Sequence, residues 1–240
     1  ALALLGTAWD YQDYPKDFLA KLDALAGKGI TVCNPPEIVR WNADKGYLLD
    51  LSERDVPVIP TIWHDDAGRA DIAAALDRFE TDRVVVKRRV GAGALGQHSF
   101  SRDALPDTDW RMGHACLIQP FLPGVPEEGE YSMIFFGDRF SHGLNKRPKS
   151  GDYRVQSLYG ATEAVWTPGE DELALARKVL STAQDITGED AFLYARVDMV
   201  RGLDGELALM ELEIIEPYLY PEQGPDLGEV FVEALKEKLG

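Results

Sequence analysis

The sequence predicts an α+β protein with antiparallel sheets, preceded by part of a small α/β unit. Two observations predict the sheets: apolar runs flank a short turn over residues 192–217, and the same pattern recurs over residues 131–144. The third observation concerns the front, where the strand-like ALALLG precedes the helix-like PKDFLAKLDALAGKG, an order typical of α/β domains. Because this expected buried strand has no preceding element, we expect a longer native chain that has lost its beginning.

Composition and charge exclude several classes of protein. The chain has 240 residues, of which 45% are hydrophobic and 28% charged, as in globular proteins with one large or two modest domains. Its net charge of −16 disfavours a nucleic-acid-binding surface and attraction to anionic lipid. No apolar run approaches the roughly 18 residues of a membrane span, and no signal peptide is visible. Two cysteines without a CxxC motif favour a reducing compartment, so we expect a cytoplasmic protein without nucleic-acid or membrane partners.

Two helices are expected before residue 60. The first begins near Pro15 and ends at Gly27, with an apolar stripe between them. The second runs over residues 42–51 with Asn42 as its N-cap, which places Lys45 in the first turn. Lysine is mildly unfavourable there because of the helix dipole. On local grounds an ordinary solvated lysine is therefore the better interpretation.

Residues 83–100 join a β-branched strand to a second strand through a glycine-rich loop. Lys87 begins a run of three basic residues at the end of the first strand, and Gly91, Gly93 and Gly96 lie in the loop. Glycine lets backbone N–H groups approach a ligand closely and form an anion-binding nest. A P-loop or a dinucleotide fingerprint would need a helix after the loop, which the pattern does not predict. The basic residues favour a phosphate ligand, and a flexible hairpin turn stays the alternative.

Five further elements are expected from the sequence pattern. A short strand over residues 56–61 and a helix over residues 72–79 come before the glycine-rich stretch. A buried strand over residues 115–123 ends in a Gln-Pro pair, where the proline frees backbone groups for another partner. Amphipathic helices are expected over residues 173–183 and from Asp226 onward.

Charged residues concentrate in the loops around the hairpin of residues 131–144. Glu127, Glu128 and Glu130 are expected in a loop before it. After it, four cations lie within nine positions: Lys146, Arg147, Lys149 and Arg154. In so acidic a protein this density indicates an anionic ligand, and a solvated mobile loop is the alternative.

The hairpin of residues 192–217 carries an acidic face. Side chains alternate along each strand, so Asp198, Glu211 and Glu213 lie on one side of the sheet. In the simplest pairing across the Gly-Leu-Asp-Gly turn, Asp198 lies opposite Leu209 and diagonal to Glu211, roughly 7–8 Å away at Cα. Converging carboxylates repel one another unless a cation lies between them, and Mg²⁺ takes oxygen ligands of this kind. A solvated face of an amphipathic hairpin is the alternative, and a register slip of one residue would remove the cluster.

The order of these features resembles the ATP-grasp superfamily, in its glutathione-synthetase-like and ribosomal-protein-S6-glutamate-ligase-like branch. A lysine-bearing strand, a glycine-rich loop, a Gln-Pro strand end, a basic loop and an acidic hairpin follow one another. The runs NPPEIVRWNADKGYLLDL, QPFLPGVPEEGEYS, GDYRVQ and MELEIIEP are similar to those of the O-ureido-D-serine cyclo-ligases and their relatives. The resemblance covers roughly residue 42 to the C-terminus.

The resemblance implies an ATP-grasp fold, in which two α+β lobes with antiparallel sheets clasp ATP. It implies that residues 1–60 are the end of an α/β N-terminal domain, 61–122 the small lobe and 123–240 the large lobe. ATP would phosphorylate a carboxylate, and an amine would attack the acylphosphate, with ADP and phosphate released. The substrate would be a small carboxylate or amino-acid derivative, cyclised in the O-ureido-D-serine group. Family habit implies a homodimer.

The resemblance also implies roles for individual residues. ATP would be held by Lys45 and Lys87, by the loop with Gly91, Gly93 and Gly96, by the adenine hinge of Gln119, Phe121 and Leu122, and by Glu130, with Glu127 as its competitor near the ribose. Catalysis would depend on Lys146, Arg154 and Arg196, the first two at the γ-phosphate. Mg²⁺ or Mn²⁺ would be bound by Asp198, Glu211 and Glu213.

Two positions depart from the family pattern. Glu213 stands where many relatives carry Asn, and Arg88 stands where Pro is frequent. The leading hypothesis is an ATP-dependent carboxylate–amine ligase. A nucleotide-binding or sensing protein without turnover is the first alternative, and a non-enzymatic acidic interaction protein is the second.

Overall fold

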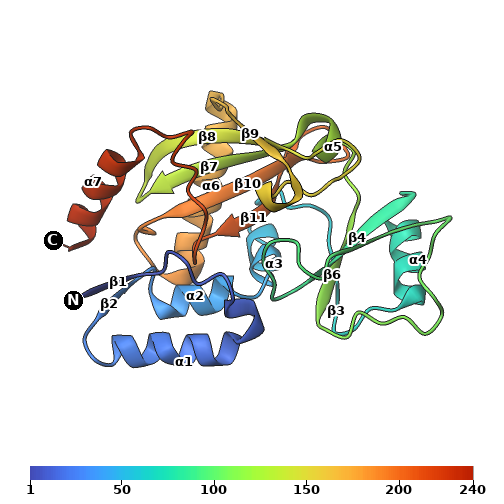
Figure 1. Ribbon diagram of the computed structural model, residues 1–240, viewed down its shortest axis with the longest axis horizontal. Coiled ribbons are helices and arrows are strands. Elements are labelled where there is room, and N and C mark those ends of the chain that lie inside the picture. Colours follow the sequence, from blue (N-terminus) through green and yellow to red (C-terminus); the bar gives the residue numbers. More distant parts are fainter. Residues whose placement is uncertain (240) are drawn as a thin grey trace.

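The computed structural model describes residues 1–239 and contains three sheets (Figure 1). Two short parallel strands form the first sheet, β1 (Leu2–Leu4) and β2 (Thr31–Cys33). The second has the order β3-β6-β4-β5, with bounds β3 Ile62–His64, β4 Arg83–Arg88, β5 His98–Ser101 and β6 Cys116–Pro120. The third has the order β11-β10-β7-β8-β9, with bounds β7 Glu130–Phe136, β8 Arg139–Arg147, β9 Thr162–Val165, β10 Ala195–Arg201 and β11 Leu207–Glu213. Both larger sheets are antiparallel, as the sequence predicts.

Three α-helices lie within the first 52 residues, and one helix prediction for this region is wrong. After the 3-10 turn η1 (Tyr11–Asp13), α1 runs Pro15–Ala26 as predicted. The helix expected over residues 42–51 is instead two helices, α2 (Pro36–Asn42) and α3 (Tyr47–Ser52). Asn42 ends the first and caps neither, because its amide pairs with the backbone of β11. β1 is also less buried than expected, with Leu4 45% exposed.

The strand expected over residues 56–61 is wrong as well. Strand β3 begins only at Ile62, and the preceding segment is a linker that forms an isolated parallel bridge between Val58 and Leu209. Pro57 and Pro60 remove two backbone donors from this segment, so it cannot form a regular ladder.

The four-stranded sheet carries α4 (Arg69–Arg78) on one face. Val84 and Val86 pack against Ile72 and Leu76 of this helix. Strand side chains alternate, so Val85 and Lys87 face the other way and line a cavity on the side of the five-stranded sheet.

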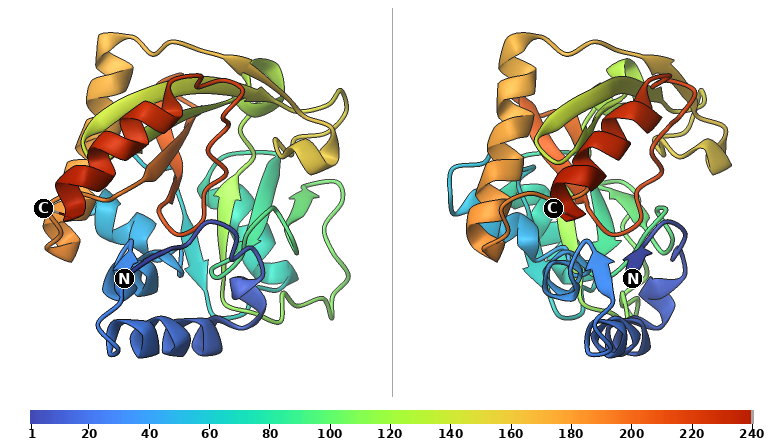
Figure 2. Two further views of the ribbon diagram at one scale, coloured as in Figure 1. Left: turned by 60° about the vertical axis from the view of Figure 1, so that its left-hand side comes forward. Right: turned by 90° about the vertical axis from the view of Figure 1, so that its left-hand side faces the viewer.

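The five-stranded sheet lies between two helices. α6 (Glu170–Thr187) covers one face, where Met133 and Phe135 belong to the largest core cluster. α7 (Leu227–Leu239) covers part of the other face, where Ile134 and Phe136 pack. α7 leaves the remainder of that second face uncovered (Figures 1 and 2). This remainder carries polar side chains, among them Lys146 and Asp198. Helix and strand periodicity thus leave one polar patch of sheet facing the four-stranded sheet.

The acidic hairpin has a bulge that changes the expected register. Asp198 pairs directly with Glu211, and Met199 pairs with Leu209, so Met210 is the extra residue on β11. The expected pairing of Asp198 with Leu209 is therefore wrong. Because of the bulge, Met210 lines the same cavity as Glu211 instead of facing away from it.

Two smaller features complete the description. Glu127 and Glu128 belong to a short helix, α5 (Gly124–Glu128), and Glu130 begins β7, so the expected acidic loop is wrong. A 3-10 turn, η2 (Ser157–Tyr159), lies in the basic loop. Across residues 1–239, no helix combines the length and apolar character that crossing a membrane requires.

Candidate functional site

A cavity of about 880 Å³ lies between the facing sides of the two larger sheets. Lys87 and Gln119 line it from the four-stranded sheet, while Arg196, Asp198 and Glu211 line it from the five-stranded sheet. Strand alternation produces this arrangement, because adjacent residues point into helix-covered cores: Val86 and Ile118 in the four-stranded sheet, and Val197 and Leu212 in the five-stranded sheet. A cavity of this size accommodates a nucleotide-sized ligand.

One end of the cavity is apolar. Leu122, Val125, Val155 and Ile59 pack together in a small buried cluster, with Met210 beside it. This cluster lies where the chain passes from one sheet to the other after β6. It provides an apolar surface of the kind that binds a flat heteroaromatic ring.

Phe121 stands beside this apolar end. The guanidinium of Arg83 lies 4.0 Å from its ring centroid, and Tyr153 meets the ring edge-on at 5.8 Å. Gln119 donates from Nε2 to Thr61 Oγ1 at 3.0 Å. The predicted hinge residues are therefore adjacent and line the cavity together.

Lys87 is a half-buried cation in the cavity wall. Its Nζ lies 3.0 Å from Met210 Sδ across the cavity, and burial lowers its pKa to about 8. The negative charge of Glu211 raises the pKa of Lys87, and the positive charge of Lys45 lowers it further. An anion bound here would gain from an ammonium whose charge is poorly compensated.

The glycine-rich loop is held from both sides of the cavity. Lys45 Nζ donates to Gly91 O at 2.8 Å, and the Tyr159 hydroxyl donates to Gly93 O at 3.3 Å. Gly93 has φ 60°, a left-handed conformation that side chains with a Cβ rarely adopt. At Gly91, an added Cβ would lie 3.3 Å from Arg88 Cβ, so the loop rests closely on that side chain.

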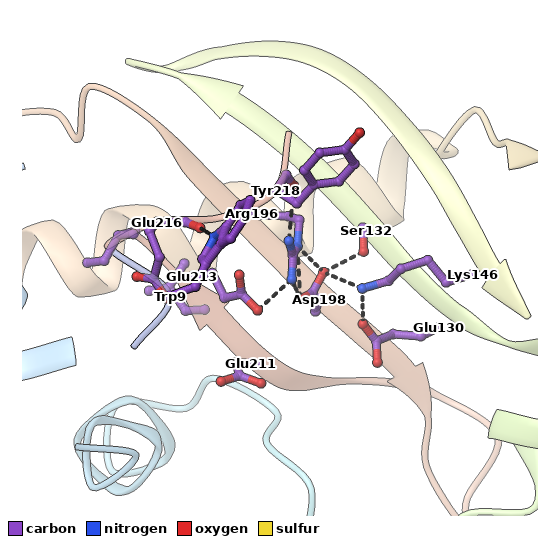
Figure 3. Close-up of polar contacts among 12 residues, drawn as sticks. Trp9, Glu130, Ser132, Lys146, Arg196, Asp198, Glu211, Glu213, Glu216 and Tyr218 are labelled. Atoms are coloured by element: carbon purple, nitrogen blue, oxygen red, sulfur yellow. Dashed lines mark hydrogen bonds and ion pairs between the residues drawn. The ribbon is translucent and has the colours of Figure 1, made fainter. Parts of the chain in front are cut away.

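The charged end of the cavity contains a buried ion network (Figure 3). Arg196 bonds both oxygens of Asp198 and also Glu213, and Lys146 bonds Glu130 and lies 3.4 Å from Asp198 Oδ1. Ser132 donates a further hydrogen bond to Asp198. Strand pairing explains the cluster, because Arg196 pairs with Glu213 and Glu130 with Lys146.

Burial and charge oppose each other in this network. Burial alone would raise the pKa of Asp198, but Arg196 and Lys146 outweigh it and hold that pKa below its usual range. Burial raises the pKa of Glu213 to about 7 despite Arg196. Burial, with Glu213 and Glu211 nearby, raises the pKa of Glu216 to about 8. Glu213 and Glu216 therefore hold a proton more readily than an ordinary carboxylate does, and Asp198 less readily.

Glu211 is tied to the front of the chain. Its carboxylate lies 2.7 Å from Lys45 Nζ, so Lys45 links Glu211 to the glycine-rich loop. The side chains of Glu211 and Glu213 are 30% and 31% exposed, whereas that of Asp198 is 3% exposed. Two carboxylates thus present oxygens to the cavity, and the third is committed to side-chain cations.

These residues fit Mg²⁺ only together with a ligand. Within residues 1–239, no three His, Cys, Asp or Glu side chains form a ready-made metal site. Mg²⁺ is usually held by one or two carboxylates plus substrate phosphates, which matches the two accessible carboxylates here. Arg196 occupies the place between Asp198 and Glu213 that the sequence argument gives to a metal ion.

Arg154 lines the cavity from the basic loop. Its guanidinium bonds Asp152 through Nε and NH2, at 3.1 and 2.7 Å, and lies 3.7 Å from the ring centroid of Tyr159. Hydrogen bonding to Asp152 raises the pKa of Arg154. In this arrangement a local carboxylate holds the cation beside the glycine-rich loop.

Most of the predicted site residues meet in the cavity. Its lining includes Lys45, Lys87, Gly91, Gly93, Gln119, Phe121, Leu122, Glu130, Lys146, Arg154, Arg196, Asp198, Glu211 and Glu213. Gly96 and Glu127 are not among the described lining residues. Glu127 is exposed on α5.

Sequence reasoning missed residues that enter the cavity from irregular segments. Trp9 and Tyr11 come from the N-terminal segment, and Glu216, Tyr218 and Tyr220 come from the segment after β11. The two segments meet where Trp9 Nε1 donates to Glu216 O at 3.2 Å (Figures 2 and 3). The run EPYLYPEQ is rich in aromatic and acidic residues, and that composition was the available signal.

Comparison with known proteins decides the family. No protein-family model matches the chain. The cycloserine biosynthesis protein DcsG of Streptomyces lavendulae is 30% identical over 248 residues, which cover 96% of this chain and 81% of DcsG. The crystal structure of D-cycloserine synthetase DcsG matches all of this chain and 84% of its own, with a TM-score of 0.85 and 27% identity.

Two other ligases share the fold. The ATP-grasp ligase PsnB, in a complex with a precursor variant, Mg and ADP, has a TM-score of 0.63 and 15% identity, covering 92% of this chain and 68% of its own. The D-alanine–D-alanine ligase of Bacillus anthracis, complexed with ATP, has a TM-score of 0.65 and 16% identity, covering 98% of this chain and 78% of its own.

The chain belongs to the ATP-grasp ligases. It is an ATP-dependent ligase that forms C–N bonds, as the resemblance implies, and the alternative of a silent nucleotide sensor is not favoured. In this ATP-grasp chain the facing sheets are the two lobes, and the cavity between them contains the candidate residues.

Proposed function

We propose that this ATP-grasp enzyme activates the carboxylate of a small amino-acid derivative with Mg²⁺-ATP and joins it to an amine of the same molecule. The cavity supports this proposal, because an apolar end, a row of cations and an acidic end follow one another along its length. The similarity to DcsG, named for cycloserine biosynthesis, supports a cyclising reaction.

The nucleotide would lie with its base at the apolar end. Leu122, Val155 and Met210 offer the apolar walls, and Phe121 with Gln119 borders them. The phosphates would then reach Lys87, Lys45 and the loop at Gly91 and Gly93. Loop amides and lysine ammonium groups neutralise phosphate charge without covalent chemistry.

The transfer step would take place at the charged end. Arg154 and Lys146 would donate hydrogen bonds to the γ-phosphoryl oxygens as the phosphoryl group passes to the substrate carboxylate. Glu211 and Glu213, with Asp198 behind them, would hold Mg²⁺, which when bound supplies charge neutralisation between the phosphates. Arg196 would keep Asp198 ionised in its buried surroundings.

The second half of the reaction needs an amine and a cavity that is closed to water. The amine would attack the acylphosphate carbon, form the C–N bond and release phosphate. The glycine-rich loop would cover the cavity during this step and keep water from hydrolysing the acylphosphate. Trp9, Glu216 and Tyr218, beyond the carboxylates, would contact the organic substrate.

A direct experiment measures ADP release. Purified protein with Mg²⁺-ATP would be offered a panel of amino acids, ureido and hydroxamate derivatives and simple carboxylates. We expect stimulation by an amino-acid derivative that carries both a carboxylate and a nucleophilic nitrogen. ATP binding without stimulation by any compound of the panel would contradict the proposal and favour a sensor. We further propose a cytoplasmic homodimer, which size-exclusion chromatography with light scattering would test.

A further inference from the structure

The outer edge of β11 is covered without a neighbouring strand. β11 is the first strand in the order of its sheet, so its outward backbone groups have no ladder partner. Before the bulge, the linker covers it: Leu209 N–H donates to Pro57 O at 2.8 Å, and Leu209 O accepts from Ile59 N at 3.3 Å. After the bulge, buried side chains replace the linker.

Asn42 pairs with β11 as the backbone of a strand would. Its Nδ2 donates to Leu212 O at 2.8 Å, and its Oδ1 accepts from Ile214 N at 3.4 Å. The Tyr47 hydroxyl accepts from Leu212 N at 2.9 Å, and Asn34 Nδ2 donates to Ile214 O at 2.8 Å. All four outward backbone groups are thus satisfied where water has little access.

These covered positions alternate with the acidic ones. Glu211 and Glu213 lie on either side of Leu212, and the bulge at Met210 sits directly before them. A slip of one residue would exchange the faces of the strand and turn both carboxylates away from the cavity. The loop from Asn42 to Tyr47 also brings Lys45 to Glu211. The same short segment therefore fixes the strand and contacts its carboxylate.

We infer that Asn42 and Tyr47 are positioning residues, which hold β11 in the register that presents Glu211 and Glu213 to the cavity. Asn42 borders the cavity, but both polar atoms of its side chain bond the backbone at Leu212 and Ile214, and the Tyr47 hydroxyl bonds Leu212 N. We therefore assign their effect to the position of the carboxylates, and the Mg²⁺-free ATP affinity tests whether either residue acts on the nucleotide directly. The inference rests on the proposed function, in which those carboxylates hold the metal ion of the nucleotide complex. Outer partners of metal ligands typically change metal affinity by 10–100-fold when they are removed.

Two variants and one matched control test this. Tyr47→Phe removes only the acceptor for Leu212 N–H and retains the ring in the core, and Asn42→Asp replaces the donor to Leu212 O by an acceptor. Asp50→Ala is the control, because it removes the acceptor of the 2.8 Å hydrogen bond from Trp41 Nε1, between the same two helices. It leaves in place the Trp41 ring that packs on Tyr47, and Asp50 does not pair with β11.

The readouts are the exchange of the Leu212 and Ile214 amides, and the Mg²⁺ concentration that gives half of the thermal stabilisation by ATP. We expect both positioning variants to speed exchange of the Leu212 amide at least tenfold and to raise the Mg²⁺ requirement about 10–100-fold. ATP affinity without Mg²⁺ should stay within a few-fold. The control should lower the melting temperature without changing either readout.

The outcomes separate the inference from the proposed function. The variants and the control are compared at a similar loss of melting temperature. If the variants then need no more Mg²⁺ than the control, the positioning role of Asn42 and Tyr47 is overturned, and the proposed metal site is unaffected. If wild type gains no stability from Mg²⁺ beyond that from ATP alone, the proposed metal role is overturned, and the inference with it. Should Asn42→Asp fail to fold, Tyr47→Phe decides the question, since its ring keeps the packing.

Discussion

Arg196 supplies the positive charge between the buried carboxylates of the cavity. It bonds Asp198 and Glu213 and also donates to Tyr218 O at 3.0 Å, so it links two strands to the segment after β11. Removing one partner of such a buried pair typically costs about 3–5 kcal/mol, because the other charge is left uncompensated. A ligand that displaces one of these contacts must therefore replace its charge.

Arg154 separates nucleotide binding from phosphoryl transfer. We expect Arg154→Lys to keep the ATP dissociation constant within a few-fold and to lower turnover at least ~100-fold, or about 2.7 kcal/mol, as for removal of one preorganised donor. A guanidinium can hold two phosphate oxygens at once, and an ammonium cannot. Calorimetry and ADP release on one preparation measure both quantities.

The control for this prediction is Arg147→Lys, since Arg147 is a nearby cation whose Nε bonds Asn145. We expect the control to retain its turnover. Equal losses of affinity and turnover in Arg154→Lys would mean that Arg154 only binds nucleotide. No loss of either would mean that the basic loop is solvated surface.

The lowered pKa of Lys87 predicts that the protein takes up a proton when it binds nucleotide. Its pKa of about 8 lies below the usual 10.4, and a bound phosphate would raise it. Near and above pH 8, binding should therefore take up protons, and affinity should fall as the pH rises. Near pH 6.5 the ammonium is already protonated, so uptake through Lys87 should be small. Mg²⁺-free calorimetry in two buffers of different ionisation enthalpy measures the uptake.

Lys87→Met is the control for that experiment, because it removes the titrating group and keeps a long apolar side chain. We expect the variant to lose the uptake near pH 8 together with part of the affinity. Uptake that persists unchanged in the variant would assign the proton to another group of the cavity.

At the scale of elements, the glycine-rich loop is the part that can move over the cavity. Among the described residues, two hydrogen bonds connect Gly91 and Gly93 of the loop to other elements: Lys45 donates to Gly91 O, and Tyr159 donates to Gly93 O. Such a loop opens more easily than a paired strand, since few contacts must break. In ATP-grasp chemistry it would open to exchange nucleotide and close for the transfer.

Hydrogen exchange tests this motion. We expect fast amide exchange over residues 90–97 without ligand, which slows at least tenfold on adding Mg²⁺ and a non-hydrolysable ATP analogue. Tyr159→Phe should speed exchange near Gly93 in the free protein, because it removes one tie. The tight turn at Gly137, between β7 and β8, is the internal control and should not respond to nucleotide. Unchanged protection in the glycine-rich loop would mark it as an ordinary structural turn.

At the scale of the whole molecule, the N-terminal segment is fastened to the large lobe by polar contacts. The Tyr194 hydroxyl lies within hydrogen-bonding distance of Leu5 O, Cys33 O and Ile215 O, at 3.1, 2.9 and 2.9 Å. Asn34 adds bonds to Tyr194 O at 3.0 Å and from Leu193 N at 2.7 Å. These contacts join the β1–β2 unit to the start of the strand that carries Arg196 and Asp198.

Removing this junction should lower stability without affecting the cavity directly. We expect Tyr194→Phe to cost roughly 1–3 kcal/mol, because buried carbonyls lose their donor. For a chain of this size the melting temperature should fall by about 2–12 °C. Tyr14→Phe, at an exposed tyrosine, should leave it unchanged. A Tyr194→Phe protein with the melting temperature of wild type would show that these hydrogen bonds contribute little to stability.

The sequence by itself predicted the sheet faces and most of the cavity residues. The shared face of Asp198, Glu211 and Glu213 follows from the alternation of side chains along strands, which is a local property with a period of two. The family resemblance implied Lys87 and Arg196. The ordered motifs also predicted the ATP-grasp family, which the similarity to DcsG confirms. Neither argument needs contacts between distant residues.

Only the tertiary structure decided the remaining features. The bulge at Met210 changed the register of the acidic hairpin. Asn42, expected to cap the start of a helix over residues 42–51, instead ends α2 and pairs with β11. Glu130 met Lys146, and Trp9 met Glu216, across separations of 16 and 207 residues. Such contacts pair charges and backbone groups that are buried. These groups need a partner only after distant segments have packed together and excluded water, so the need cannot be read from local sequence.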